Sequence, residues 1–290
     1  MSRDIYNKKW IIDNSINICD RYEDGILTLR ALHYQLVSIG MTNDIQHYKR
    51  VVDAMKSARW DGLIGFEKFS DHERSMIGST DYAETLYHEK VEESKHQIRL
   101  WMTTYSKNKW ENQENYIEVL IEKKALQGVF DPVCKKLGVG LGACKGYPSL
   151  TFLHEMSNRF LDVTATGKGV IIVYFGDYDP SGDDIPRSIQ ENLEKFGVNV
   201  GIDRVALNKD QVLEWKLPSA PVKITDSRTK KWDGIGQVEL DSILPEKLQS
   251  MCKDAIMNYF DTGLYKDLIL QEKEESERFR RELKTFVSEI

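Results

Sequence analysis

Residues 169–186 read GVIIVYFGDYDPSGDDIP. Val170 to Phe175 is apolar and rich in β-branched side chains, which is typical of a buried strand in a parallel sheet. Asp177 and Asp179 follow directly, and because they are two residues apart, an extended chain points both carboxylates to the same side. Open α/β sheets bind ligands at the carboxyl ends of their strands, and paired carboxylates there suit Mg²⁺ and a phosphate substrate. The alternative interpretation is a solvated acidic loop.

The rest of this stretch predicts a turn and then a helix. Gly182 supplies the turn. Asp183 and Asp184 stand where a helix N-cap belongs, with Pro186 in the first turn. We therefore expect a helix over residues 185–196.

Length and composition indicate a globular protein with two domains. The chain has 290 residues, of which 41% are hydrophobic and 30% charged. No window approaches a membrane span, and Met1-Ser2-Arg3-Asp4 does not begin a signal peptide. The four cysteines form no CxxC pair, which indicates reduced thiols rather than a zinc site or disulfides. We expect an intracellular protein, cytoplasmic and associated with the nucleoid, with no membrane partner.

The net charge of -6 argues mildly against nucleic-acid binding, but the charge is unevenly spread. Residues 1–110 carry 16 Lys and Arg against 16 Asp and Glu, whereas residues 111–290 carry 24 against 30. An acidic metal-binding half is therefore compatible with a basic DNA-binding surface in the first half.

The first part of the chain has the pattern of three helices followed by a short apolar segment. We expect a helix over residues 5–20, a helix capped by Thr28, a helix over residues 45–59, and a short strand or wing at residues 62–66. This is the order of a winged-helix DNA-binding domain. An ordinary helical hairpin with solvated lysines fits the same pattern. If the third helix binds DNA, its candidate contacts are Lys49, Arg50, Lys56 and Arg59.

After a polar segment at residues 107–115, which we expect to be a linker, strands and helices alternate. The expected strands lie at residues 116–121, 139–144, 170–175 and 198–207, and the helices between them at 124–137, 149–160 and 185–196. Such alternation predicts a parallel sheet flanked by helices. We therefore place a mainly α winged-helix domain at residues 1–108 and an α/β domain at residues 109–290. A charged helix at residues 264–290 would pack at a dimer interface or lie on the surface.

A third carboxylate is expected near Asp177 and Asp179. Glu122 ends the first expected strand of the α/β domain, as Asp177 and Asp179 end the third. Three carboxylates at one edge of a sheet can gather one or two Mg²⁺ ions and stabilise both oxygens of a phosphoryl transfer. One Glu on one strand and Asp-x-Asp on a neighbouring strand resembles the arrangement of a Toprim domain.

Several segments make this resemblance specific. IEKKAL at residues 121–126, GYPS at 146–149 and DYDPSG at 177–182 resemble the Toprim domain of the topoisomerase VI A subunit and of the meiotic double-strand-break transesterases. TLRALHY at residues 28–34 is similar to the winged-helix segment of this family, in which an Arg lies four residues before the nucleophilic Tyr. The family often has an aromatic residue where this chain has His33.

A last segment resembles shorter members of the same family. LDSILP at residues 240–245, preceded by Asp226-Ser227-Arg228, is similar to stand-alone relatives in mobile elements and phages, sometimes called mini-A. The resemblance as a whole covers about residues 26–245.

The resemblance implies a Mg²⁺-dependent DNA-cleaving transesterase of the type IIB topoisomerase class. Tyr34 carries over as the nucleophile, and Arg30 and Glu122 carry over as catalytic residues. Glu122, Asp177 and Asp179 carry over as Mg²⁺ ligands. A phenol titrates near pH ~10, so it needs help to attack phosphorus, and Arg30 lies one helical turn before Tyr34 on the same face. A buried helix aromatic is the alternative for Tyr34.

The resemblance also implies partners. The family cleaves double-stranded DNA as a homodimer, with the Tyr of one subunit facing the metal of the other. The chain contains no Walker-type Gly-rich loop, so ATP-driven strand passage would require a separate ATPase subunit of the B type.

The sequence allows more than one role for several residues and more than one function for the chain. Lys145 beside Gly146 is a candidate phosphate contact, and the basic stretch Arg228 to Trp232 is a candidate DNA contact; solvated or flexible loops are the alternatives. Glu239 and Asp241 either extend the metal shell or begin an acidic helix. The alternative functions are a Toprim metal-dependent DNA hydrolase without a covalent intermediate, and a non-catalytic DNA-binding subunit that needs a partner ATPase.

Overall fold

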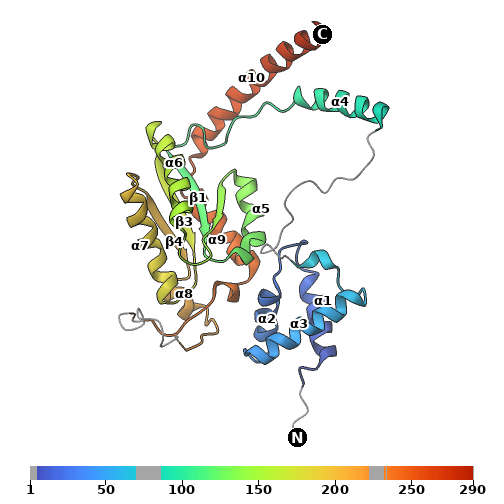
Figure 1. Ribbon diagram of the computed structural model, residues 1–290, viewed down its shortest axis with the longest axis vertical. Coiled ribbons are helices and arrows are strands. Elements are labelled where there is room, and N and C mark those ends of the chain that lie inside the picture. Colours follow the sequence, from blue (N-terminus) through green and yellow to red (C-terminus); the bar gives the residue numbers. More distant parts are fainter. Residues whose placement is uncertain (1–4, 70–85, 222–231, 233, 290) are drawn as a thin grey trace. The chain divides into compact units, whose positions relative to one another are not determined.

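The computed structural model describes residues 5–69, 86–221, 232 and 234–289. The chain divides into two compact units, whose helices and strands are labelled in Figure 1. The first unit comprises Met1–Arg74 and Asn115–Asn258, and the second comprises Ser75–Glu114 and Tyr259–Ile290. This grouping joins segments that are distant in the chain, and it differs from the sequence-based division at residue 108.

The first unit contains a four-stranded sheet in which all strands are parallel. Its strands are β1 (Asn115–Ile121), β2 (Gly140–Ala143), β3 (Gly169–Phe175) and β4 (Gly201–Ala206), in the order β2-β1-β3-β4. The prediction of a parallel α/β sheet flanked by helices is therefore confirmed. The register pairs Ile121 with Phe175, so β1 and β3 end side by side.

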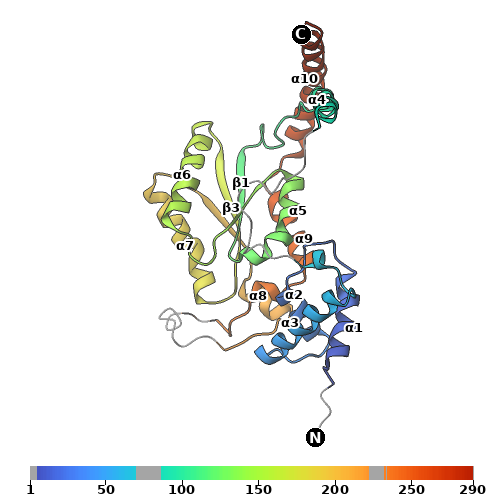
Figure 2. The ribbon, with the colours of Figure 1, turned by 45° about the vertical axis from the view of Figure 1, so that its right-hand side comes forward.

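Helices cover both faces of this sheet, which explains the continuous apolar run of β3. They are α5 (Gln127–Leu137), preceded by the 3-10 turn η2 (Lys124–Leu126), α6 (Leu150–Ala165), α7 (Pro180–Lys195), α8 (Lys209–Glu214) and α9 (Pro245–Met257). In Figure 2, α6 and α7 lie on one face, and α5 and α9 on the other. Side chains of β3 alternate between the two faces: Tyr174 joins the core with α6 and α7, whereas the Phe175 ring lies 4.7 Å from that of Phe130 in α5.

The start of α7 differs from the prediction. The N-cap is Asp179, whose Oδ1 accepts hydrogen bonds from the backbone N–H groups of Ser181 (2.9 Å) and Gly182 (2.7 Å). The predicted helix start at residue 185 with an N-cap at Asp183 or Asp184 is therefore wrong. Pro180 is the physical reason, because a proline fits the first helical position, where no N–H partner is needed.

The N-terminal part of the first unit is helical, as predicted. It consists of α1 (Lys8–Cys19), α2 (Leu29–Ser38) and α3 (Ile45–Trp60), which share one apolar core. Thr28 caps α2 through the N–H of Ala31, and Asp44 caps α3. The strand predicted at residues 62–66 is wrong: Gly62 turns the chain, Ile64 is buried in the helical core, and the 3-10 turn η1 (Phe66–Lys68) follows.

The second unit contains α4 (Tyr87–Trp101) and α10 (Thr262–Glu289). Residues 107–115, predicted as a linker, include packed side chains: Trp110 is buried with its ring 5.2 Å from that of Phe260, and the Gln113 amide bonds both to the carbonyl (3.0 Å) and to the N–H (2.6 Å) of Asp261. None of the helices in the described ranges has the length and hydropathy needed to cross a membrane.

Candidate active site

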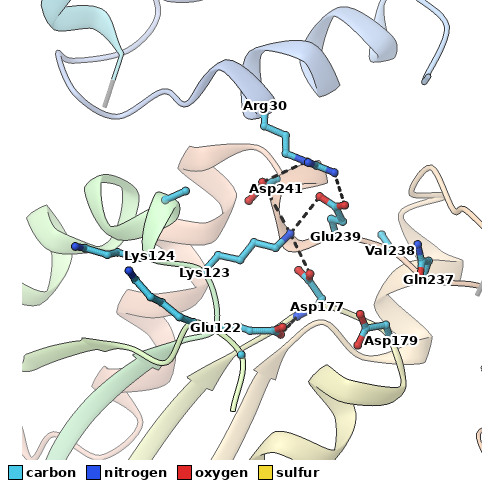
Figure 3. Close-up of a pocket in the computed structure, with 13 residues that line it drawn as sticks. Arg30, Glu122, Lys123, Lys124, Asp177, Asp179, Gln237, Val238, Glu239 and Asp241 are labelled. Carbon is cyan, nitrogen blue, oxygen red and sulfur yellow. Dashed lines mark hydrogen bonds and ion pairs between the residues drawn. The ribbon is translucent and has the colours of Figure 1, made fainter. Parts of the chain in front are cut away.

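A cavity of about 460 Å³ lies at the carboxyl ends of β1 and β3 (Figure 3). It is also bordered by α2 and by the segment around the 3-10 turn η4 (Leu240–Ser242). Five acids line it, namely Glu122, Asp177, Asp179, Glu239 and Asp241. Four cations line it as well, namely Arg30, Lys123, Lys124 and Lys145. The cavity is therefore rich in charge and nearly balanced.

The structure brings the three predicted metal ligands to this one cavity. Glu122 continues the pairing of β1 with β3, since its N–H donates to the Phe175 carbonyl at 2.8 Å. Its Oε2 accepts a hydrogen bond from the backbone N–H of Asp177 at 2.9 Å. Asp179 lies two residues further on, with one oxygen used in capping α7.

Burial makes ionisation of these acids costly. Burial, and then the neighbouring Asp177 carboxylate, raise the pKa of Glu122 to about 7. Burial also raises the pKa of Asp177, against the effect of Lys123. The pKa of Asp241 is raised to about 6, again mainly by burial. These acids would therefore be stabilised in their ionised forms by an added cation.

Sequence reasoning missed Lys123, which lies at the centre of the acidic group. Its ammonium is 2.9 Å from Asp177 Oδ2, 3.1 Å from Glu239 Oε2 and 3.9 Å from Asp241 Oδ2. Burial lowers the pKa of Lys123, but the three carboxylates outweigh burial and raise it above the ordinary value. Its place next to Glu122 was the available signal, yet neighbours in an extended chain point to opposite sides. In the structure, the Lys123 ammonium nevertheless lies among the acids.

Glu239 and Asp241 also line the cavity, although they lie far from Glu122 and Asp177 in the sequence. The Asp241 residue is only 4% exposed, and its Oδ1 has no hydrogen-bond partner. Burial raises the pKa of Glu239, but Lys123 and Arg30 together lower it below the ordinary value. Glu239 and Asp241 do begin a helical turn, since Glu239 is the N-cap of η4 and Asp241 lies in its first turn, and both residues also line the cavity.

Arg30 links the cavity to Tyr34. Its guanidinium forms an ion pair with Glu239, and its Nε is 3.9 Å from Asp241 Oδ2. Arg30 also borders a second cavity of about 100 Å³, which Tyr34 and Tyr48 line. Tyr34 is partly exposed. Burial and then Glu239 raise the pKa of its phenol, whereas Arg30 opposes this shift.

His33, the departure from the family pattern, lies against Tyr34. It is 4% exposed, its ring centroid is 5.9 Å from that of Tyr34, and its Nε2 has no hydrogen-bond partner. Burial lowers the pKa of His33.

The candidate DNA contacts on α3 differ in how exposed their side chains are. Lys49, Arg50 and Lys56 are exposed on α3. Arg59 is half-buried: its guanidinium lies 5.6 Å and 5.5 Å from the rings of Phe66 and Phe69, so it helps to hold the segment after α3.

Two candidate contacts remain. Lys145 lines the acidic cavity in a left-handed backbone conformation (φ 54°), and Arg228 lies outside the described residues. Trp232 lies with its ring 5.0 Å from that of Tyr178.

Arg204 on β4 is a second residue that sequence reasoning missed. Its guanidinium donates to the carbonyls of Asp177 (2.9 Å), Leu207 (2.8 Å) and Gly182. In α7 the Gly182 carbonyl would accept from residue 186, but Pro186 has no N–H. Arg204 replaces that missing donor and holds the turn that carries Asp177. An arginine near the end of a short strand, with apolar residues after it, was the available signal.

The donor set of the cavity fits Mg²⁺, because carboxylate oxygens are its preferred protein ligands and burial favours an added positive charge here. Among residues 5–69, 86–221, 232 and 234–289, no three acids, histidines or cysteines are grouped as ligands of one metal ion. The side-chain contacts explain this: Glu122 accepts from a backbone N–H, Asp179 caps α7, and Lys123 lies between the others.

Comparison of the chain with known protein families finds no family that matches, and comparison with curated proteins finds no match either.

Proposed function

We propose that the chain is a Mg²⁺-dependent DNA-cleaving transesterase that resembles the A subunit of topoisomerase VI, with Tyr34 as its nucleophile. The observation that carries the proposal is the position of Arg30. It borders both the cavity of Tyr34 and the acidic cavity, and it pairs with Glu239 in the latter. A guanidinium at that point can bind a phosphate group that bridges the two cavities.

In the proposed reaction, a phosphate ester of Tyr34 replaces a phosphate ester of deoxyribose. The Tyr34 hydroxyl gives its proton to solvent, and its oxygen forms a bond to phosphorus. The bond from phosphorus to a deoxyribose oxygen breaks, and that oxygen takes up a proton from solvent. The product is a phosphotyrosyl ester and a free DNA end.

Each neighbouring group has a defined task. Arg30 holds the phosphate and favours the phenolate of Tyr34, since its charge already opposes the rise in the phenol pKa. Glu122, Asp177 and Asp179 would hold Mg²⁺, which when bound supplies positive charge for the phosphate oxygens. Lys145 lines the cavity and would contact a neighbouring phosphate.

The partners of this activity are double-stranded DNA, a second copy of the chain, and a separate ATPase of the B type if strands are to be passed. They rest on the resemblance of the motifs in residues 26–245. The resemblance implies that the Tyr34 of one copy acts at the acidic cavity of the other, whereas Arg30 joins the two cavities within a single chain.

A metal-dependent hydrolase is the second candidate, and one observation favours it. Burial and Glu239 raise the pKa of Tyr34, which makes the phenolate harder to form. A hydrolase would instead use water at the acidic cavity and would not need Tyr34.

One experiment separates these functions. The full chain is incubated with Mg²⁺ and end-labelled duplex DNA, and the products are run on a denaturing gel with and without protease treatment. A transesterase gives protein-linked DNA that protease releases, and Tyr34→Phe, which keeps the ring, abolishes both the link and the cleavage. Cleavage without a link that survives in Tyr34→Phe identifies the hydrolase. DNA binding with no cleavage in either protein would contradict both.

A further inference from the structure

The acidic cavity has a second cluster of oxygens next to the three predicted ligands. Asp177, Glu239 and Asp241 all face the ammonium of Lys123, at 2.9, 3.1 and 3.9 Å (Figure 3). The three carboxylates come from two segments, the turn after β3 and the segment that contains η4. Only Asp177 belongs to both this cluster and the predicted metal-binding set.

The cluster has more capacity for positive charge than it receives. Asp241 Oδ1 is buried and has no hydrogen-bond partner, and Oδ2 lies 3.9 Å from both Lys123 Nζ and Arg30 Nε. A buried carboxylate without close partners is costly. An unpartnered oxygen on a buried residue that lines the cavity indicates that this corner can take a further positive charge, and Lys123 is the cation closest to the three carboxylates.

We propose that Asp177, Glu239 and Asp241 form a second cation subsite, and that its resident cation is the Lys123 ammonium of the chain itself rather than a second Mg²⁺. The chain then binds one divalent ion, on the side of Glu122 and Asp179. Lys123 supplies the second positive charge toward the phosphate. This inference rests on the proposed function for the first ion but not for the subsite.

The Lys123 ammonium is part of the chain, so the subsite is filled without the binding of an ion from solution. Lys123 follows Glu122 directly, so the fold that forms the first site also delivers Lys123 to the second. Lys123 bonds to two carboxylates within 3.1 Å, and a second divalent ion would have to displace it. Removal of the ammonium leaves three carboxylates with Arg30 alone, which favours entry of a divalent ion.

The test counts bound metal rather than activity. Mn²⁺ is titrated into the full chain without DNA, and free Mn²⁺ is measured by electron paramagnetic resonance. We expect one tight Mn²⁺ per chain for the wild type and two for Lys123→Met. Lys124→Met is the matched control, because Lys124 lines the same cavity outside the Lys123 cluster, and it should keep one. The double variant Lys123→Met with Asp241→Asn should return to one.

Other outcomes decide against the proposal or separate it from the proposed function. Two ions in the wild type, or one ion in both the wild type and Lys123→Met, would overturn it. No ion in the wild type but one in Lys123→Met supports the subsite while contradicting the metal site of the proposed function, and no ion in either protein contradicts both. Circular dichroism in EDTA checks folding, and Lys123→Gln, for which two ions are also expected, replaces Lys123→Met if the latter does not fold.

Discussion

The carboxylate of Glu122 accepts a hydrogen bond from the backbone N–H of Asp177 at 2.9 Å, which places two acids from neighbouring strand ends in one buried corner. Ionisation of Glu122 is disfavoured there by burial and by the charge of Asp177, and its pKa rises to about 7. The stability of the folded protein should therefore depend on pH when no metal is bound.

The first prediction concerns Glu122→Gln. Because the folded-state pKa of Glu122 is raised, its contribution to stability is fully present below the unfolded-state value of 4.5 and is lost as pH rises through about 7. The variant keeps the acceptor oxygen but does not ionise. Relative to the wild type, its free energy of unfolding should therefore rise by about 2 kcal/mol between pH 5 and pH 8.

Urea denaturation in EDTA at the two pH values measures this difference. Glu155→Gln, at an exposed position on α6, is the control and should follow the wild type. If Glu122→Gln also follows the wild type, the raised pKa of Glu122 is refuted.

The second prediction concerns Gly182, where α7 approaches the site most closely. A Cβ at this position would lie 2.3 Å from the Asp177 carbonyl oxygen and 3.0 Å from Glu122 Oε2. Gly182→Ala should therefore destabilise the protein by about 1–3 kcal/mol through overpacking, despite the better helix propensity of alanine. Gly140→Ala is the matched control, because its Cβ would meet only an ordinary contact at 3.5 Å from Glu118. Thermal unfolding of both variants decides; equal stability would mean that the turn adjusts freely.

The third prediction concerns Arg204→Lys. A lysine keeps the charge but cannot donate in fixed directions to the carbonyls of Asp177, Leu207 and Gly182. We expect a loss of about 2–4 kcal/mol in the free energy of unfolding, since hydrogen bonds from a charged donor are worth about 1.5–3 kcal/mol each. Arg187→Lys, in an exposed ion pair with Asp184, should leave the stability close to that of the wild type. Similar values for both variants would show that Arg204 does not hold the turn.

The fourth prediction concerns DNA binding by α3. Replacing the exposed Lys49, Arg50 and Lys56 by Glu should weaken binding to duplex DNA. It should also flatten the dependence on salt, because each lost phosphate contact removes about 0.9 from the slope of log affinity against log salt. Fluorescence anisotropy at several salt concentrations measures both quantities.

The matched control reverses three exposed cations of α10, Arg280, Arg281 and Lys284, and it should retain the wild-type slope. Loss of binding in the control alone would place the DNA on α10 instead of α3.

Local pattern was sufficient for most of the secondary structure. The apolar run of β3, the alternation of strands and helices, and the cap Thr28 all appear in the structure where the pattern indicates. The errors fell where two local signals compete. Asp179 and Asp183 are both plausible N-caps, and the structure uses Asp179 because Pro180 can follow it. At residues 62–66, Gly62 turns the chain and Ile64 is buried in the helical core, so no strand forms.

The sequence by itself determined the sheet, its direction, and the edge at which Glu122, Asp177 and Asp179 gather. These follow from apolar periodicity and from the position of acids after strands, which are properties of neighbouring residues. Only the tertiary structure decided that Lys123 lies among the acids, that Arg204 supports their turn, and that Arg30 meets Glu239 across 209 positions of the chain. Such contacts depend on how distant segments pack and on which buried charges need partners, and no local pattern encodes either.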